Sequence, residues 1–149
     1  MLFFHYKKLM IPAAAVIAAN LLAGASVRSE SDLMTQLLKE RTVTLQQAYD
    51  RTLTPDQAEE RLQEIETQPL LREDVKTLRE FADTELDFVE GVEIRKLKVC
   101  FAVFGKKGYD AEILWYMNGM NGRYLQEQDY YILLDGSGKR PRLSKFDPR

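Results

Sequence analysis

Residues 109–134 read YDAEILWYMNGMNGRYLQEQDYYILL, and this stretch decides the fold. Two runs rich in aromatic and aliphatic residues flank residues 118–122, which contain two Asn-Gly steps. Asn and Gly tolerate the positive φ angles that tight hairpin turns need. The stretch therefore predicts two antiparallel strands, 109–117 and 123–134, joined by a short turn.

The alternation of apolar and polar residues continues on both sides of this hairpin. Ahead of it, residues 92–103 predict a strand with an irregularity near Lys96, where the alternation is reset. After it, residues 135–138 turn the chain and residues 141–146 form a short edge strand, a place where proline is tolerated. We therefore expect a four-stranded antiparallel meander over residues 91–148.

Residues 30–90 carry helix signals instead. Three helices are expected, at about 31–51, 54–67 and 70–88. The first contains a β-branched patch at 42–44 that can bend or split it. The second opens with Thr54-Pro55-Asp56-Gln57, a capping box with proline at the first helical position. Because the apolar stripes of these helices can cover one face of the sheet, the predicted fold class is α+β, with N-terminal helices packed on a four-stranded antiparallel meander.

Composition favours a single domain and argues against nucleic-acid binding. The chain has 149 residues, of which 45% are hydrophobic and 30% charged, enough for one core. Residues 30–90 hold sixteen Asp/Glu and seven Lys/Arg, whereas residues 91–149 hold seven and eleven. A chain divided in this way lacks the strongly basic face of a nucleic-acid-binding protein, and its two parts should attract each other.

The N-terminal residues resemble an export signal. Lys7 and Lys8 precede the uncharged stretch 9–27, which would span roughly 28 Å as a helix, close to the thickness of the hydrocarbon layer of a bilayer. Ala23-Gly24-Ala25 offers a cleavage site, whereas apolar residues ahead of the lysines favour a retained anchor. We expect residues 1–27 to be a signal peptide or membrane anchor, and residues 28–149 to form a single extracytoplasmic domain, secreted or held at the outer side of the cytoplasmic membrane.

The sequence predicts no catalytic residue, no metal site and no cofactor. Cys100 is the single cysteine and lies in an apolar run, so we expect a buried thiol. The single histidine, His5, precedes the apolar segment, which leaves the domain without the commonest general base near neutral pH. Four carboxylates on neighbouring strands could converge, but ion pairs with Lys or Arg are the expected role for Asp110, Glu112, Glu127 and Asp129.

A candidate binding groove comes from two runs that are apolar at consecutive positions, 113–117 and 130–134. A sheet with one wet face should alternate more cleanly, so something covers the second face of these strands. Packing within the domain is one explanation. The other is a partner or ligand groove, formed by Trp115, Tyr116, Tyr130 and Tyr131 with Asp110 and Asp129 beside them. The basic cluster Lys139, Arg140, Arg142, Lys145 and Arg149 could touch anionic lipid or an acidic partner, or pair with the acidic helices of the same chain.

Residues 129–136 (DYYILLDG) and 141–148 (PRLSKFDP), placed after helices and long antiparallel strands, resemble the NTF2-like superfamily, also called SnoaL-like or cystatin-like. The resemblance implies a curved sheet wrapped around helices as a cone, sometimes with a pocket. Many exported members are accessory or assembly subunits, including the periplasmic domains of VirB8-like conjugation proteins. We therefore expect a non-enzymatic extracytoplasmic binding or assembly module with a protein partner or self-association. The alternatives are a small ligand-binding or hydrolytic domain and a membrane-anchored subunit of a transfer or secretion machine.

Overall fold

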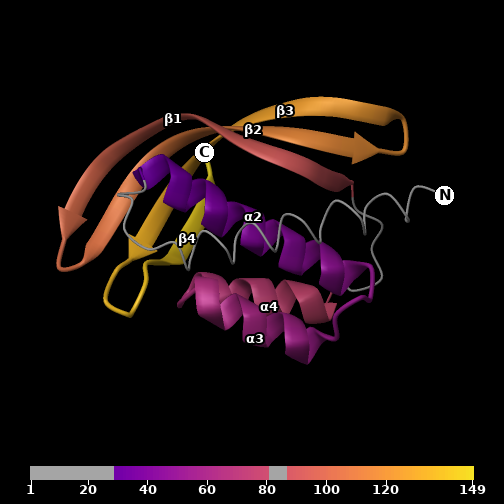
Figure 1. Cartoon of the computed structure of the whole chain (residues 1–149), viewed down its shortest axis with the longest axis horizontal. Helices are drawn as coiled ribbons and strands as arrows, with labels where there is room; N and C mark the ends of the chain where they lie inside the picture. Colours follow the sequence, from indigo (N-terminus) through magenta and orange to yellow (C-terminus); the bar gives the residue numbers. More distant parts are fainter. Residues whose placement is uncertain (1–28, 81–86) are drawn as a thin grey trace.

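The computed structural model describes residues 29–80 and 87–149, and within them three helices precede four strands (Figure 1). The elements are α2 (Glu30–Tyr49), α3 (Pro55–Ile65), α4 (Leu70–Glu80), β1 (Phe88–Val103), β2 (Lys106–Gly119), β3 (Gly122–Asp135) and β4 (Arg142–Pro148). The strands form one open antiparallel sheet in the order β1-β2-β3-β4. This confirms the predicted α+β class and the meander. The predicted signal or anchor, 1–27, lies outside the described residues.

Helix α2 is continuous, whereas the β-branched patch at 42–44 was expected to allow a bend. Its N-cap is Ser29, whose side chain accepts a hydrogen bond from the backbone N–H of Asp32. Within the patch, the Thr44 hydroxyl donates to the carbonyl of Glu40 one turn earlier, at 2.8 Å, and Thr44 is buried. Tertiary packing therefore decides the shape of this helix, and the weaker local propensity of the patch does not.

Helix α3 starts as the capping box predicts. The Thr54 side chain accepts from the N–H of Gln57, the Gln57 side chain accepts from the N–H of Thr54, and Pro55 is the first helical residue. The helix ends at Ile65, before the predicted position 67, because the next residues turn toward β4. Glu66 bridges to Leu143 in parallel, and the N–H of Thr67 donates to the Leu143 carbonyl at 2.8 Å.

The third predicted helix is shorter than expected at its C-terminal end. The structure describes α4 as far as Glu80, and Phe88 already pairs with Asn118 as the first residue of β1. The expected helix over residues up to 88 is therefore wrong at Phe88, which takes its place in the β1–β2 ladder. Residues 81–86 of the predicted helix lie outside the described part of the chain.

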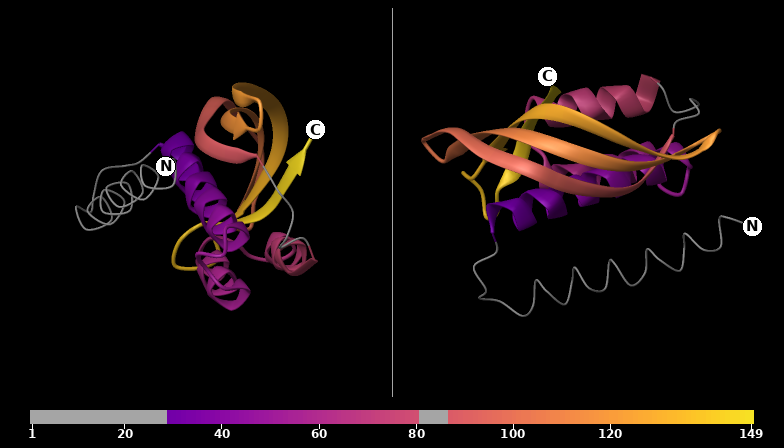
Figure 2. Two further views of the ribbon diagram at one scale, coloured as in Figure 1. Left: turned by 90° about the vertical axis from the view of Figure 1, so that its right-hand side faces the viewer. Right: turned by 90° about the horizontal axis from the view of Figure 1, so that it is seen from above.

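The sheet is long and curved, and it arches over α2 (Figures 1 and 2). Strand β1 contains three irregularities in its register with β2, one of them between Ile94 and Lys96 as predicted. Strand β4 is short and pairs with β3 only from Tyr130 to Asp135. The strands therefore form an extended three-stranded ribbon, and the fourth strand widens it at one end.

The core lies between the concave face of the sheet and the helices. Helix α2 packs on β1, while α3 and α4 contact β4 (Figure 2). The fully buried apolar side chains come from all three layers: Met34, Leu37 and Leu38 of α2, Leu62 of α3, and Tyr109, Ile113, Ile132 and Leu143 of the sheet. The helical stripes thus cover one face of the sheet, as the sequence predicts.

Two further points concern predictions about exposure and the membrane. Cys100 was expected to be buried but is exposed, because it lies at a register shift of β1 between Val99 and Phe101, where the strand carries exposed residues. Among the described helices, none combines the length and apolar content needed to cross a bilayer.

Candidate functional site

The structure divides the six predicted groove residues between the two faces of the sheet. Trp115 and Tyr130 point to the helix-covered face, where Trp115 is 7% exposed. The indole Nε1 of Trp115 donates to the Tyr130 hydroxyl at 3.0 Å, and the Tyr130 ring stacks on Phe146 with 4.3 Å between centroids. These aromatic residues belong to the core.

The other four, Asp110, Tyr116, Asp129 and Tyr131, point to the opposite face, because neighbouring residues of a strand alternate in direction. Asp110 faces Tyr131 across the ladder. Arg149 lies over both of them, with its guanidinium 2.7 Å from Asp110 Oδ1 and 5.2 Å from the centre of the Tyr131 ring. Tyr116 lies several positions farther along β2. The six residues thus do not form one groove.

Two of the four predicted strand carboxylates, Asp110 and Glu112, form ion pairs on this outer face. Glu112 accepts from Lys96 Nζ at 2.7 Å, and this hydrogen bond lowers the pKa of Glu112 and raises that of Lys96. Asp110 pairs with Arg149 as described above. Both observations agree with the expectation that these carboxylates pair with Lys or Arg. In the parts of the chain that the structure describes, no three acidic, His or Cys side chains are grouped as metal ligands.

The end of the sheet around the β2–β3 turn carries exposed aromatic and apolar side chains on both faces, with Tyr116 and Leu125 on one face and Met117 and Tyr124 on the other, and we call this end the distal patch. Its members are Glu90, Tyr116, Met117, Arg123, Tyr124 and Leu125, which line a shallow hollow of about 140 Å³. A second hollow of about 280 Å³ lies beside it, lined by Asp87 and residues 119–124. Leu125 is 62% exposed, and Tyr116 and Tyr124 are about two-fifths exposed.

Hydrogen bonds and ion pairs hold the side chains of the distal patch in place. The Tyr124 hydroxyl donates to Asp87 at 2.6 Å, and the Tyr116 hydroxyl donates to Glu93 at 2.9 Å. Each of these bonds raises the pKa of its tyrosine, because the neighbouring carboxylate accepts from the neutral phenol. Arg123 pairs with Glu90 at 2.9 Å. The patch therefore presents fixed tyrosine rings that are apolar on their faces and polar at one tip.

Next to the distal patch, β3 has an open edge. The backbone N–H of Arg149 donates to the Asp129 carbonyl at 2.9 Å, and among the described residues no strand pairs with this side of β3 between Gly122 and Asp129. Since backbone groups alternate in direction along an antiparallel strand, Leu125 and Glu127 point theirs outward as Asp129 does. An open edge of this kind can accept another strand.

A buried ionic cluster lies far from this patch, between α2, α4 and β4. Arg41 Nε is 3.0 Å from Glu66 Oε1 and 2.8 Å from Asp74 Oδ2, and its guanidinium lies 5.0 Å from the centre of the Phe146 ring. Glu66 is fully buried, and within the described chain its second oxygen accepts no hydrogen bond. The cluster therefore links α2, the α3–α4 region and β4.

The surroundings of Glu66 raise the pKa of its carboxyl group. Burial raises the pKa of Glu66 to about 9, the neighbouring Asp74 carboxylate adds to the rise, and Arg41 opposes it. One guanidinium thus faces two carboxyl groups, and the raised pKa favours the protonated form of Glu66. A protonated carboxyl is able to act as a general acid, but neither of the two hollows is lined by a residue of the cluster. The geometry fits a structural clamp better than a reaction centre.

Sequence reasoning missed the cluster, although one signal was present. Asp74 lies four residues after Leu70 and four before Leu78, on the apolar stripe of α4, where all three are buried. A carboxylate on such a stripe needs a buried partner. The signal identifies Asp74 as unusual, but the partners are 33 and 8 residues away in the chain and cannot be read from spacing.

Comparisons with known proteins add little to this geometry. No family model matches the chain, and no curated protein matches it. The chain is similar to the solved intermembrane space region of the chloroplast protein ARC6, with 12% identity and a TM-score of 0.47 over 81% of this chain and 97% of that one. It is also similar to a de novo designed β-sheet protein, with 13% identity and a TM-score of 0.38 over 79% of this chain and 90% of that one. Likenesses this remote support no conclusion about function.

Proposed function

We propose that this chain is a non-enzymatic, extracytoplasmic binding module that captures an extended segment of a partner protein at the open edge of β3. The observation that carries the proposal is the unpaired edge of β3 from Gly122 to Gln128, where alternate residues point their backbone groups outward beside the exposed side chains of the distal patch. Backbone hydrogen bonds would supply affinity, and Tyr116, Tyr124 and Leu125 would select the side chains of the added strand.

The apolar segment 9–27 and the two lysines ahead of it support a location outside the cytoplasm. An NTF2-like ancestry, and a role as an assembly subunit of a transfer or secretion machine, would both fit this arrangement of a leader followed by a helix-covered sheet. Genes that neighbour this one and encode such a machine would support the subunit role.

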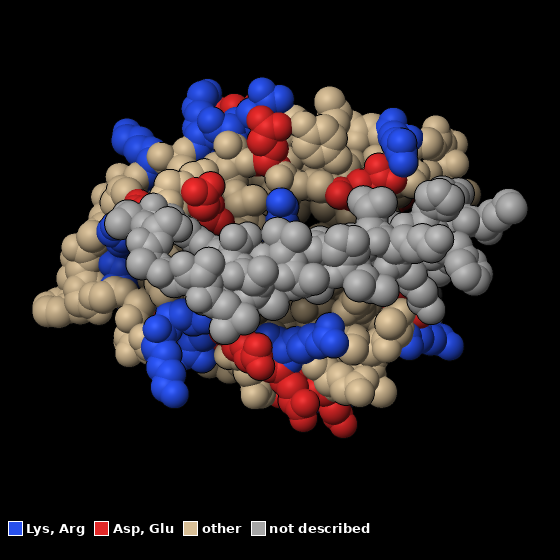
Figure 3. Space-filling model, in the orientation of Figure 1, with Lys and Arg blue, Asp and Glu red and all other residues tan. Residues whose placement is uncertain are grey.

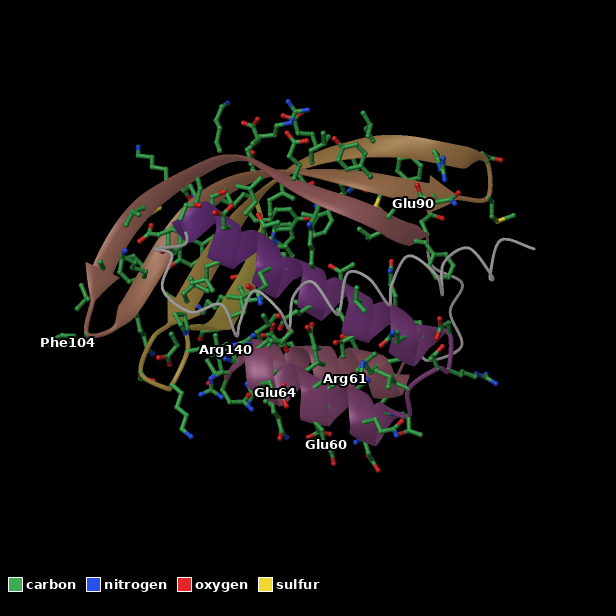
Figure 4. The ribbon with its side chains drawn as sticks, in the orientation of Figure 1. Glu60, Arg61, Glu64, Glu90, Phe104 and Arg140 are labelled. Carbon is green, nitrogen blue, oxygen red and sulfur yellow. The ribbon has the colours of Figure 1, made fainter. Side chains whose placement is uncertain are left out.

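Site-specific photocrosslinking in the producing cells tests the partner site. A photoreactive phenylalanine analogue is placed at Leu125, and a control probe is placed at Glu60, which is exposed on α3 (Figure 4). We expect the probe at 125 to form a discrete covalent adduct with one extracytoplasmic protein and the probe at 60 to form none. Equal adduct patterns at both positions would contradict the proposal.

A backbone variant then separates strand addition from simple side-chain contact. Glu127→Pro removes an N–H that points to the open edge and leaves the β2–β3 ladder intact, since proline is tolerated on edge strands. Glu127→Ala is the matched control, because it removes the same side chain and keeps the N–H. We expect Glu127→Pro to abolish the adduct from the probe at 125 and Glu127→Ala to retain it. Loss in both variants would mean that the Glu127 carboxylate, and not the edge, holds the partner.

A second candidate function is a small hydrolytic domain in which Glu66, whose pKa is raised, would be the acid, although Glu66 is fully buried and lines neither hollow. Turnover of a panel of ester and amide substrates by the full chain, lost in Glu66→Gln, would support it. Activity that survives this substitution would exclude the buried cluster as the reaction centre.

A further inference from the structure

The end of the domain opposite the distal patch brings three segments together, and we call it the proximal end. It consists of the β1–β2 turn at Phe104 and Gly105, the loop at residues 136–141, and the start of α2 (Figures 1 and 2). The Gly136 N–H donates to the Gly105 carbonyl at 2.7 Å, which joins the two turns. Lys107 forms an ion pair with Glu30, which joins the turn to α2.

Phe104 is unusual in both exposure and backbone conformation. It is 97% exposed and projects from the tip of the hairpin (Figure 4). Its φ angle is +49°, followed by +76° at Gly105, a conformation that favours Gly, Asn or Asp in two-residue hairpin turns. A bulky aromatic residue at this position makes folding less favourable and gains no burial within the domain. Its side chain is therefore available for a contact outside the domain.

More apolar side chains follow Phe104 down the hairpin. Val103 is half exposed, and Phe101 and Val99 are each about two-fifths exposed. The Phe101 ring covers Gly108 so closely that a Cβ on that glycine would lie 2.3 Å from the ring. The tip is therefore a firm apolar projection, because the ring below it is fixed against the neighbouring strand.

Positive charge surrounds this projection. Lys106 follows the turn and Lys139 lies on the loop bonded to it, and both are exposed without an ion-pair partner in the described parts of the chain. Of the nearby acids, Glu30 pairs with Lys107 and Glu40 pairs with Arg140 at 2.9 Å. Asp135 accepts from the N–H of Ser137 and lies opposite Lys106 across the β2–β3 ladder, where the two charges attract each other. In Figure 3 the uncharged tip projects at the left, with blue side chains beside it.

The short separation in sequence between segment 9–27 and the start of α2 bears on what the proximal end faces. The uncharged stretch 9–27 ends three residues before Glu30, and three residues span at most about 11 Å. A bilayer that receives this stretch therefore lies close to the proximal end. An aromatic residue ringed by lysines suits the interface of such a bilayer, because the ring enters the headgroup layer and the lysines attract anionic lipid.

We propose that the proximal end docks onto an anionic bilayer surface, with Phe104 inserted between the headgroups and Lys106 and Lys139 against lipid phosphates. The proposal depends on the proposed export segment being retained as a membrane anchor, and not on partner capture at β3. It gives the domain a fixed orientation, in which the distal patch points away from the membrane.

The test compares two equally exposed turns at opposite ends of the full chain. In a Cys100→Ser background, a single cysteine replaces either Phe104 or Met120, which are 97% and 93% exposed, and carries an environment-sensitive fluorophore. The protein is mixed with vesicles of phosphatidylcholine, with or without phosphatidylglycerol. We expect a blue shift, and quenching by spin-labelled lipid, for the label at 104 on the anionic vesicles, and no response for the label at 120.

Charge variants complete the test. Lys106→Glu combined with Lys139→Glu should remove the response of the label at 104, since each lysine near an anionic surface is worth about 1 kcal/mol, or roughly fivefold in binding. Arg72→Glu combined with Lys76→Glu makes the same charge change on exposed positions of α4 and should leave the response intact.

Equal responses at 104 and 120, or a label at 104 that remains in water on both vesicles, would overturn the proposal. In the second case an acidic protein becomes the better candidate for the partner that binds the proximal end. Crosslinking from Leu125 is independent of either result, so failure of membrane docking and failure of partner capture can be told apart.

Discussion

Replacing Phe104 by Asn should stabilise the fold while removing the apolar tip. A left-handed backbone costs an L-residue about 1–2 kcal/mol, and Asn bears less of this cost because its short side chain bonds locally. Since the Phe104 side chain is 97% exposed, almost no buried apolar area is lost. We expect a net gain of about 1 kcal/mol in the free energy of unfolding, or about 4 °C in Tm for a domain of this size.

Urea unfolding of the full chain, followed by the fluorescence of the single tryptophan, Trp115, measures this gain. Phe104→Ala is the first control, because it removes the ring but keeps the unfavourable φ, and it should leave stability unchanged. Met120→Asn is the second, since Met120 is nearly as exposed but has no positive φ. If Phe104→Asn unfolds at the same or lower urea than the parent, the turn is not strained and the argument for an external contact of Phe104 fails.

Three further predictions concern the buried cluster and the open edge. The folded-state pKa of Glu66 is raised from 4.5 to about 9, so between these pH values the unfolded chain loses the proton that the native state retains. The free energy of unfolding should therefore fall with rising pH, by at most about 1.4 kcal/mol per pH unit. In Glu66→Gln the urea midpoint should depend less on pH, whereas Glu64→Gln should keep the pH dependence of the parent. Arg41→Met leaves the buried Asp74 carboxylate and the Glu66 carboxyl without their guanidinium partner and should cost about 3–5 kcal/mol, whereas Arg61→Met on the surface should cost under about 1 kcal/mol. Similar urea midpoints for the two variants would contradict the clamp. Glu127→Pro should change stability by under about 1 kcal/mol, since its N–H points away from β2, and a larger loss would show that this N–H belongs to the β2–β3 ladder.

The parts of the fold that were predictable from the sequence rest on local rules. The Thr54 capping box acts within four residues, and the hairpin from 109 to 134 combines a period of two with turn residues. The β1 irregularity near Lys96 also shows in the pattern, because an extra residue shifts the alternation. Each of these features is fixed by residues that are neighbours in the chain.

The six predicted groove residues lie on both faces of the sheet. The prediction treated each apolar run as one unit, whereas the alternation rule applies to single positions. Trp115 and Tyr116, and likewise Tyr130 and Tyr131, are consecutive residues, so one of each pair must face the helices. The cluster of Arg41 with Glu66 and Asp74 was missed for a different reason. Its members come from three separate segments, and only the packing of α2 against the α3–α4 connection brings them together.

The proximal and distal ends are coupled by the rigidity of the sheet between them. Strand β2 runs the whole way from Lys106, beside the proximal turn, to Gly119 at the distal hollow, a path of at most about 46 Å for its fourteen residues. The same strand is paired on both sides along its length, and the buried cluster fixes α2, whose first residue contacts Lys107, to the rest of the core. A membrane contact at Phe104 and a captured strand at β3 therefore need no hinge between them: fixing one end in the plane of a bilayer fixes where, and in what direction, the other end presents its open edge.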